Sequence, residues 1–232
     1  MASKKKAAAR KKDPGKKPAN LEARIRTLES RLRKLESNTV LALNDVLVLQ
    51  KGKACMTVKV LGNLQIVNGL GKTDTTNGCG NLIIGYNEPP PSSSGWPGTR
   101  TGSHNLILGR FHSHASYAGL LSGEMGMTTV NAPASCVVGG AEGSANADRC
   151  VVVGGQENKG NSSRCVVIGG FDNGANNAEF AVVAGGINNR ADAANSCIFG
   201  GGRNTTNSTA SGSTILGGSG LTTSTPGQRI PP

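Results

Sequence analysis

The chain has 232 residues, of which 34 are glycine, 36% are hydrophobic and 3% are aromatic. Globular domains carry roughly 45–50% apolar residues, so this composition excludes a thick conventional core and the apolar pocket walls of a compact enzyme. The net charge of +11 is unevenly spread: residues 1–37 hold 13 Lys/Arg and 4 Asp/Glu, and residues 38–232 hold 12 and 10. The basic character therefore belongs to the N-terminal end and leaves the rest of the chain nearly neutral.

Residues 1–20 are a Lys-, Ala- and Pro-rich segment that we expect to be a disordered basic tail. Its cations are Lys4, Lys5, Lys6, Arg10, Lys11, Lys12, Lys16 and Lys17. They suit a solubilising tail, an arm that binds the phosphates of a nucleic acid, or a dock onto another acidic partner. Aromatic residues that could stack on bases are missing between these cations.

The N-terminus lacks the apolar run of a secretion signal, and the sequence lacks an apolar stretch long enough to span a membrane. We therefore expect cytoplasmic synthesis without a signal peptide and no membrane span. Later release by lysis or by a dedicated machine stays open.

Residues 21–50 carry a heptad pattern, in which seven of nine a and d positions through Leu49 are Leu, Ile or Val. A 3.5-residue period over four heptads is typical of a coiled coil. Two copies of an Arg–apolar–x–x–apolar–Glu pattern lie in register and resemble the trimerisation motif of short coiled coils, in which Arg pairs with Glu of the next helix. The residues concerned are Arg24, Ile25, Leu28, Glu29, Arg31, Leu32, Leu35 and Glu36.

Ile at a with Leu at d would by itself favour a dimer, but the repeated motif leads us to predict a trimer. The alternative is an amphipathic helix that packs on its own domain. The end of the helix is open between about residues 38 and 50. Residues 51–78 then alternate apolar and polar side chains, which predicts a β neck.

From residue 79 to 218 the sequence repeats a short apolar run that ends in glycine, as in NLIIG at 81–85, CVVGG at 136–140 and CVVIGG at 165–170. The first glycines of the last six copies are 15, 15, 16, 15 and 17 residues apart. Helical repeats need about 33 residues, so we predict a mainly β fold: a parallel β-roll or β-solenoid of about 15-residue repeats. Residues 86–104 are an insertion into the repeat, and residues 219–232 are a C-terminal extension.

This pattern of apolar run, glycine and Asn-rich turn resembles the head repeats of trimeric autotransporter adhesins, the YadA-like left-handed parallel β-roll, and similar repeats in phage tail spikes and fibres. The resemblance covers residues 79–218, with a coiled coil alongside. It implies a homotrimer and a structural, receptor-binding role. Because a secretion signal and a membrane anchor are missing from the pattern, an autotransporter is disfavoured, and a fibre of a virion or injection-system particle, or a protein at the cell surface after release, is expected.

The insertion is the best candidate for recognition, because loops on a rigid repeat scaffold commonly carry binding residues. It contains the only Trp, Trp96, with Tyr86, Arg100 and His104 nearby. Exposed aromatic and Arg side chains are typical anchors for partners, so we expect a surface glycan or protein receptor here. The alternative is a structural collar over the start of the roll.

His112 and His114 form the one ligand-like pair. On a strand they would point the same way, and three copies at a threefold axis could hold a metal, as H-x-H sites do in some phage spikes; the alternative is a polar surface pair, and otherwise we expect no cofactor. Cys136, Cys150, Cys165 and Cys197 each begin an apolar run and should share one face of successive coils. We expect small buried free thiols, with disulfides or a metal ladder as alternatives.

Nothing in the sequence indicates an enzyme. The acidic residues of the repeat fall in turns at scattered positions, without the paired carboxylates of a glycosidase. They are Glu142, Asp148, Glu157, Asp172, Glu179 and Asp192. We therefore predict a non-enzymatic homotrimeric fibre, spike or adhesin-like protein that is attached through its basic N-terminus to a larger phage-like or injection-system assembly. The alternative is a structural cytosolic trimer whose Lys-rich arms bind nucleic acid or another acidic partner.

Overall fold

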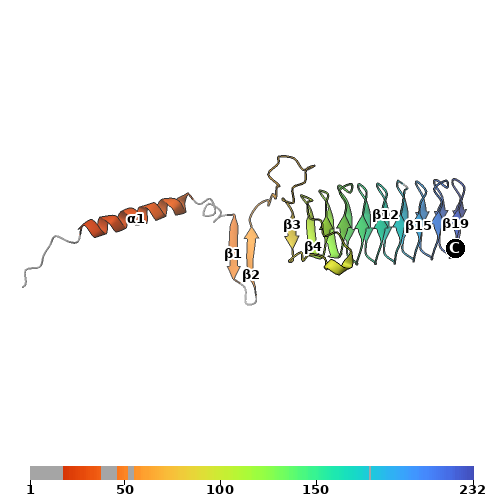
Figure 1. Ribbon diagram of the computed structural model, residues 1–232, viewed down its shortest axis with the longest axis horizontal. Helices are drawn as coiled ribbons and strands as arrows, with labels where there is room; N and C mark the ends of the chain where they lie inside the picture. The colour runs from red at the N-terminus through yellow and green to blue at the C-terminus, as the bar shows by residue number, and fades with distance from the viewer. Residues whose placement is uncertain (1–17, 38–45, 52–54, 178) are drawn as a thin grey trace, which may run out of the picture. The chain divides into compact units, whose positions relative to one another are not determined.

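The computed structural model describes residues 18–37, 46–51, 55–177 and 179–232. The chain divides into two units, Met1–Gln65 and Ile66–Pro232, and each is described by itself. Figure 1 shows one helix and a two-stranded hairpin in the first unit, and a long stack of short strands in the second. The basic cations of residues 1–17 lie outside the described residues.

The helix of the first unit, α1, spans Pro18–Glu36. Proline suits the first turn of a helix, where its missing N–H has no intrahelical partner, and Arg33 and Lys34 in the last turn complement the helix dipole. Its heptad positions Ile25 and Leu28 are 45% and 59% exposed. The predicted helix is therefore present, and its apolar stripe is uncovered in the single chain.

The hairpin joins β1 (Leu47–Lys51) and β2 (Met56–Val60), which pair antiparallel with Leu47 opposite Val60. The helix was expected to end between about residues 38 and 50, and β1 excludes the part of that range from Leu47 onward. An uninterrupted apolar run such as Leu47–Val48–Leu49 satisfies heptad spacing and strand patterning equally, and pairing with β2 decides between them. The strand character predicted for the neck is confirmed over β2.

The second unit is a parallel β-solenoid of about eight turns, built from a ten-stranded and an eight-stranded sheet. The ten-stranded sheet contains, in spatial order, β3 (Leu82–Ile84), β4 (Leu106–Arg110), β6 (Leu120–Glu124), β8 (Cys136–Val138), β10 (Val151–Val153), β12 (Val166–Ile168), β14 (Val182–Ala184), β16 (Cys197–Ile198), β18 (Thr214–Ile215) and β20 (Arg229–Ile230). The eight-stranded sheet contains β5 (Ser113–His114), β7 (Met127–Thr128), β9 (Ser144–Ala145), β11 (Lys159–Gly160), β13 (Gly174–Ala175), β15 (Arg190–Ala191), β17 (Thr205–Thr206) and β19 (Thr222–Thr223). A short 3-10 helix, η2 (Ser92–Ser94), lies in the insertion.

Successive strands pair in the register that the repeat predicts. Val137, Val152 and Val167 are direct partners in neighbouring coils, one repeat apart. All nine apolar runs found in the sequence form strands of the ten-stranded sheet, which confirms the parallel solenoid. Residues 219–232, expected as an extension, contribute β19 and β20 and so add to the same stack.

The core is a single file of side chains along the solenoid axis. In eight of the ten strands, from β4 to β18, one apolar residue points inward and is 0–1% exposed; these residues are Ile107, Leu121, Val137, Val152, Val167, Val183, Ile198 and Ile215. Small residues such as Ala145, Ala175 and Ala191 face them from the eight-stranded sheet. A narrow interior has no room for large side chains, which explains the composition.

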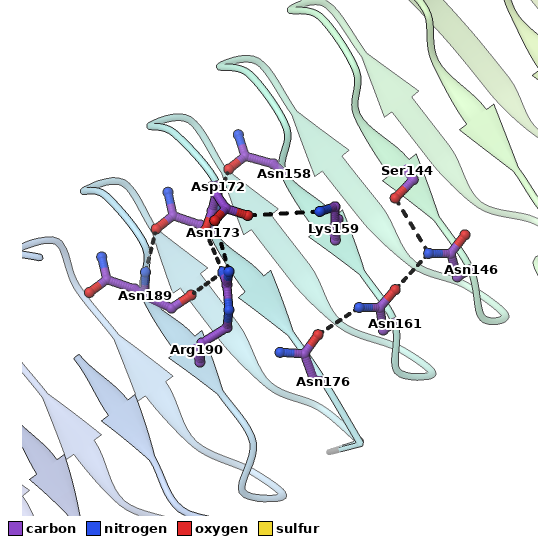
Figure 2. Close-up of polar contacts among 10 residues, drawn as sticks. All are labelled: Ser144, Asn146, Asn158, Lys159, Asn161, Asp172, Asn173, Asn176, Asn189 and Arg190. Atoms are coloured by element: carbon purple, nitrogen blue, oxygen red, sulfur yellow. Dashed lines mark hydrogen bonds and ion pairs between the residues drawn. The ribbon is translucent and has the colours of Figure 1, made fainter. Parts of the chain in front are cut away.

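A second file inside the solenoid consists of buried asparagines at one corner: Asn158, Asn173, Asn189 and Asn204. Figure 2 shows three of them in successive coils. The Oδ1 atom of each accepts a hydrogen bond of 3.0 Å from a backbone N–H of the next coil. Each Nδ2 donates to glycine carbonyls of its own and the next coil, such as those of Gly169 and Gly186 for Asn173. This ladder satisfies the backbone where the chain turns between the sheets.

The second glycine of each Gly–Gly pair lies where successive coils stack most closely. Gly155, for example, has φ of 73°, and a Cβ there would collide with the carbonyl oxygen of Gly170 in the next coil. The coils approach closely at this corner because these side chains are absent. The Gly–Gly signature of the sequence therefore marks a required turn and not a phosphate-binding loop.

Candidate functional site

The insertion begins at the end of β3 and is partly absorbed into the stack. Its last part pairs with β5: the backbone N–H of His114 donates to the carbonyl of Thr99 at 2.7 Å, and Gly102 N–H donates to the carbonyl of His114 at 2.9 Å. The hydroxyl of Ser113 also accepts from the N–H of Thr99 at 3.0 Å. Residues 99–102 are therefore held by backbone hydrogen bonds against β5, at the end of the eight-stranded sheet.

The four expected recognition residues occupy different surroundings. Tyr86 is 94% exposed, whereas Trp96 is half-buried with its indole Nε1 enclosed and unpartnered. Arg100 is held by a 2.6 Å hydrogen bond from Nη2 to the carbonyl of Glu88. His104 lies 3.2 Å through Nδ1 from the carbonyl of Thr73. The structure thus places Tyr86 alone of the four fully in solvent.

Tyr86 lines an open groove of about 560 Å³ where the first coils turn. The groove is lined by Gly85, Tyr86, Glu88, Gly109, Arg110, Gly123, Glu124 and Gly140, without Trp96, Arg100 or His104. Arg110 and Glu124 end β4 and β6 and form an ion pair of 3.1 Å. The sequence analysis missed both. The sequence does mark these two residues: Arg110 follows the glycine of NLILG and Glu124 follows that of AGLLSG, at the position where later repeats have a second glycine.

The buried ring of His112 takes the place of an asparagine in the corner ladder. Its Nδ1 accepts from the N–H of Gly126 at 3.0 Å, and its Nε2 lies 2.9 Å from the carbonyl of Leu108. These are the two kinds of bond that the ladder asparagines make, and they require a neutral ring that carries its proton on Nε2. Burial lowers the pKa of His112, which favours that neutral form.

His114 lies inside the second sheet and is 2% exposed, with both ring nitrogens unpartnered. Burial, followed by the charge of the nearby Arg100 and the electrostatic influence of the His112 ring, lowers the pKa of His114 to about 4. Neither imidazole reaches the surface, so the predicted metal site shared by three copies at an axis is wrong for His112 and His114. Among the described residues, His, Cys, Asp and Glu do not gather in threes in a way that could hold a metal ion.

The four cysteines of the repeat lie in two files, which corrects the prediction of one shared face. Cys150 and Cys165 precede the strand by one residue and point inward, where a disulfide joins them across adjacent coils with Cα atoms 4.9 Å apart. Cys136 and Cys197 begin their strands, are half-buried and are free thiols. Three residues separate Cys150 and Cys165 from the glycine pair, whereas two residues separate Cys136 and Cys197 from it. This one-residue difference decides which of the two files each cysteine joins.

The acidic turn residues also depart from the expectation of scattered positions. Glu142, Glu157 and Asp172 occupy the same place in successive coils, each with positive φ of 47–58°. Asp172 pairs with Arg190 at 2.9 Å and with Lys159 at 3.8 Å (Figure 2). Within this file, Asp172 joins two cations of neighbouring coils in a structural ion-pair network on the surface.

Beside this network runs an exposed amide ladder. The Nδ2 of Asn146 donates to Asn161 at 2.6 Å, and Asn161 donates to Asn176 at 2.6 Å (Figure 2). Asn176 in turn donates to the carboxylate of Asp192 at 3.1 Å. The outward residues of the adjoining eight-stranded sheet, such as Lys159 and Thr205, are polar as well. This side of the solenoid is hydrophilic along the described coils.

The outer face of the ten-stranded sheet is apolar instead. Residues on either side of the inward middle position point outward, and they are half-buried or exposed in the single chain: Leu106, Leu108, Leu120, Val138, Val151, Val153, Val166, Ile168, Val182, Phe199 and Leu216. Ile168, Phe199 and Leu216 are 46–48% exposed. An uncovered apolar face of this length is characteristic of an interaction surface.

Comparisons with known proteins supply no relative: the chain matches no family model, no curated protein and no solved structure. In the part of the chain that the structure describes, no helix combines the length and the apolar character needed to cross a membrane. The parallel solenoid is therefore established by the structure alone. Such a fold is compatible with the structural role of a fibre or spike.

Proposed function

We propose that the protein is a non-enzymatic, homotrimeric fibre or spike component, in which the solenoid is a shaft that displays binding surfaces. The observation that carries this proposal is the apolar outer face of the ten-stranded sheet. Val166 and Ile168 flank the inward Val167 on one strand and both point outward. Side chains of this kind gain about 25 cal/mol per Å² when they leave water, so a long file of them favours burial against other copies.

The helix supports the same assembly independently. Leu32 and Leu35 are each 54% exposed on α1, and Ile25, Leu28, Glu29 and Arg31 share their surface. Helices with this stripe gain stability by packing against copies of themselves. The repeated Arg–Glu motif favours three helices, and three copies with closed cyclic symmetry form a finite assembly.

The basic N-terminus is the proposed attachment to a larger assembly. Its cations bind an acidic surface, either of a phage-like or injection-system particle or of nucleic acid, by sequence-independent contacts that weaken as salt rises. Deletion of residues 1–17 should leave the trimer intact and abolish salt-sensitive retention on the assembly. If the full chain is retained on naked DNA and not on the particle, and the deletion abolishes that retention, the nucleic-acid-binding alternative is favoured.

The assembly face is tested by charge. Ile168→Lys, on the exposed outer face, should break the association of the solenoids, because a buried unpaired ammonium costs several kcal/mol. Thr205→Lys, on the outer face of the eight-stranded sheet, is the matched control. Cross-linking or light scattering of both variants, with the whole first unit (residues 1–65) removed so that the helix cannot compensate, reports whether the solenoids associate. Equal association of the two variants would contradict the proposed face.

A further inference from the structure

We propose that the groove between Tyr86 and the Arg110–Glu124 pair binds a carbohydrate, whose apolar ring face stacks on Tyr86 and whose hydroxyls bond the ion pair. This inference deepens the proposed display function by naming a ligand class and a site. The inference rests on three features: the exposed Tyr86 ring, the Arg110–Glu124 ion pair and the glycine backbone between them.

Tyr86 is an exposed ring on a fixed backbone. The neighbouring Asn87 is only 5% exposed, and the carbonyl of Glu88 accepts hydrogen bonds from Phe111 N–H at 3.0 Å and from Arg100 Nη2 at 2.6 Å. The segment that carries the ring is therefore held to the first coils. A rigid aromatic side chain offers a large contact area at a small entropic cost, which makes Tyr86 a suitable stacking platform.

The two coils that follow Tyr86 offer a donor and an acceptor together, because Arg110 and Glu124 stand at the same place in the strand register. Nη2 of Arg110 lies 3.1 and 3.2 Å from the two carboxylate oxygens of Glu124, and the Arg110 guanidinium also lies 4.8 Å from the centre of the Phe111 ring. Both charged side chains are partly exposed, so they retain N–H donors and oxygen lone pairs for a ligand. Neighbouring hydroxyls of a sugar match this arrangement, and the balanced charge suits a neutral sugar better than a phosphate.

The floor of the groove is backbone. Gly85, Gly109 and Gly123 have φ of 101–116° and contribute no side chains where the coils stack. These positions are glycines because the coils pack closely there. A ligand in the groove would therefore contact peptide groups at its base. Tyr86 is the one apolar side chain among the described lining residues, and a peptide ligand would want further apolar pockets. The composition of the groove therefore favours a sugar.

The test is saturation-transfer NMR on the full chain with the methyl glycosides of glucose, galactose and N-acetylglucosamine as probes. We expect transfer to the ring protons of at least one glycoside. Tyr86→Ala should weaken binding by roughly tenfold, since loss of an aromatic anchor has effects of this order, and Tyr86→Trp should restore it. Phe180→Ala, which removes a half-exposed ring in a distant coil, is the matched control and should leave binding unchanged.

Three outcomes would overturn the inference: no transfer to any of the three glycosides, transfer that is equal in Tyr86→Ala and Phe180→Ala, or a groove-dependent protein ligand without sugar transfer. Arg110→Gln, which keeps an N–H donor but not the charge, should weaken binding less than Tyr86→Ala. The mass of each sample in solution separates the two proposals. Binding by a monomer contradicts the trimer only, and a trimer without binding contradicts the carbohydrate site only.

Discussion

The first coils of the solenoid and the regular coils after residue 150 solve the same folding problem differently. In the regular coils, Asn158, Asn173 and Asn189 bond the backbone above and below at every turn. In the first coils, His112 replaces asparagine, and the coils are interrupted by the insertion. In regular coils, each repeated asparagine finds the same hydrogen-bond partners in the next coil. Where a coil departs from the repeat, each buried polar side chain needs a partner of its own.

The unpartnered buried polar atoms follow this division. Among the described residues they are atoms of Asn87, Trp96 and Arg100 in the insertion, of His114, Ser116 and Thr128 in the first coils that follow it, and Asn146 Oδ1 further along the stack. Thr206 and Thr223, at the position of Thr128 in later coils, bond serine hydroxyls at 2.8 Å. Buried polar groups without partners cost stability, so the first coils should be the weaker part of the shaft, and they also carry the candidate binding groove.

The largest expected effect comes from breaking the regular ladder. Asn173→Leu removes one hydrogen bond from each of two glycine carbonyls, which keep a second partner, and leaves the Asn189 N–H unpaired. It should lower the free energy of unfolding by roughly 3–5 kcal/mol. Asn161→Leu in the exposed ladder is the control and should cost about 1 kcal/mol or less, because water replaces its partners. Urea unfolding measures both, and equal losses would show that the buried ladder is not stabilising.

A smaller effect is expected from acid, and it should be confined to the first coils. The pKa of His114 is lowered to about 4 in the folded chain, so between pH 6.5 and 4 the unfolded chain takes up a proton that the folded chain refuses. Stability should fall over this window by roughly 3 kcal/mol. Hydrogen exchange at pH 7.5 and pH 4 locates the loss. His114→Asn should remove most of it, and an unchanged acid response in that variant would exclude His114 as the cause.

The smallest effect tests whether His112 acts as a ladder residue. His112→Asn should change the free energy of unfolding by about 1 kcal/mol or less, because an amide offers the same acceptor and donor to Gly126 and Leu108. His112→Leu should cost roughly 2–4 kcal/mol, because both backbone groups lose their partner. Thermal melts of the two variants decide the matter. A similar loss in both would mean that the imidazole is needed for its shape.

Much of the fold could be predicted from the sequence, because glycine-ended apolar runs at a nearly constant period fix both the strands and their register. The sequence pattern was not decisive where it suits a helix and a strand equally. Residues 47–49 fit the heptad spacing, but they form part of β1. The two cysteine files depended on a one-residue difference before the glycine pair. Arg110 and Glu124 meet only after the coils stack, so the groove could not be read from either residue alone.

The mass of the full chain in solution tests the central claim most directly. Light scattering after size exclusion in high salt should give three times the chain mass of 23.6 kDa. The apolar sheet face and the helix stripe would then be covered by other copies, and high salt removes assembly that rests on the basic tail. The mass of a single chain would contradict the account, because these apolar surfaces would be stable in water without a partner.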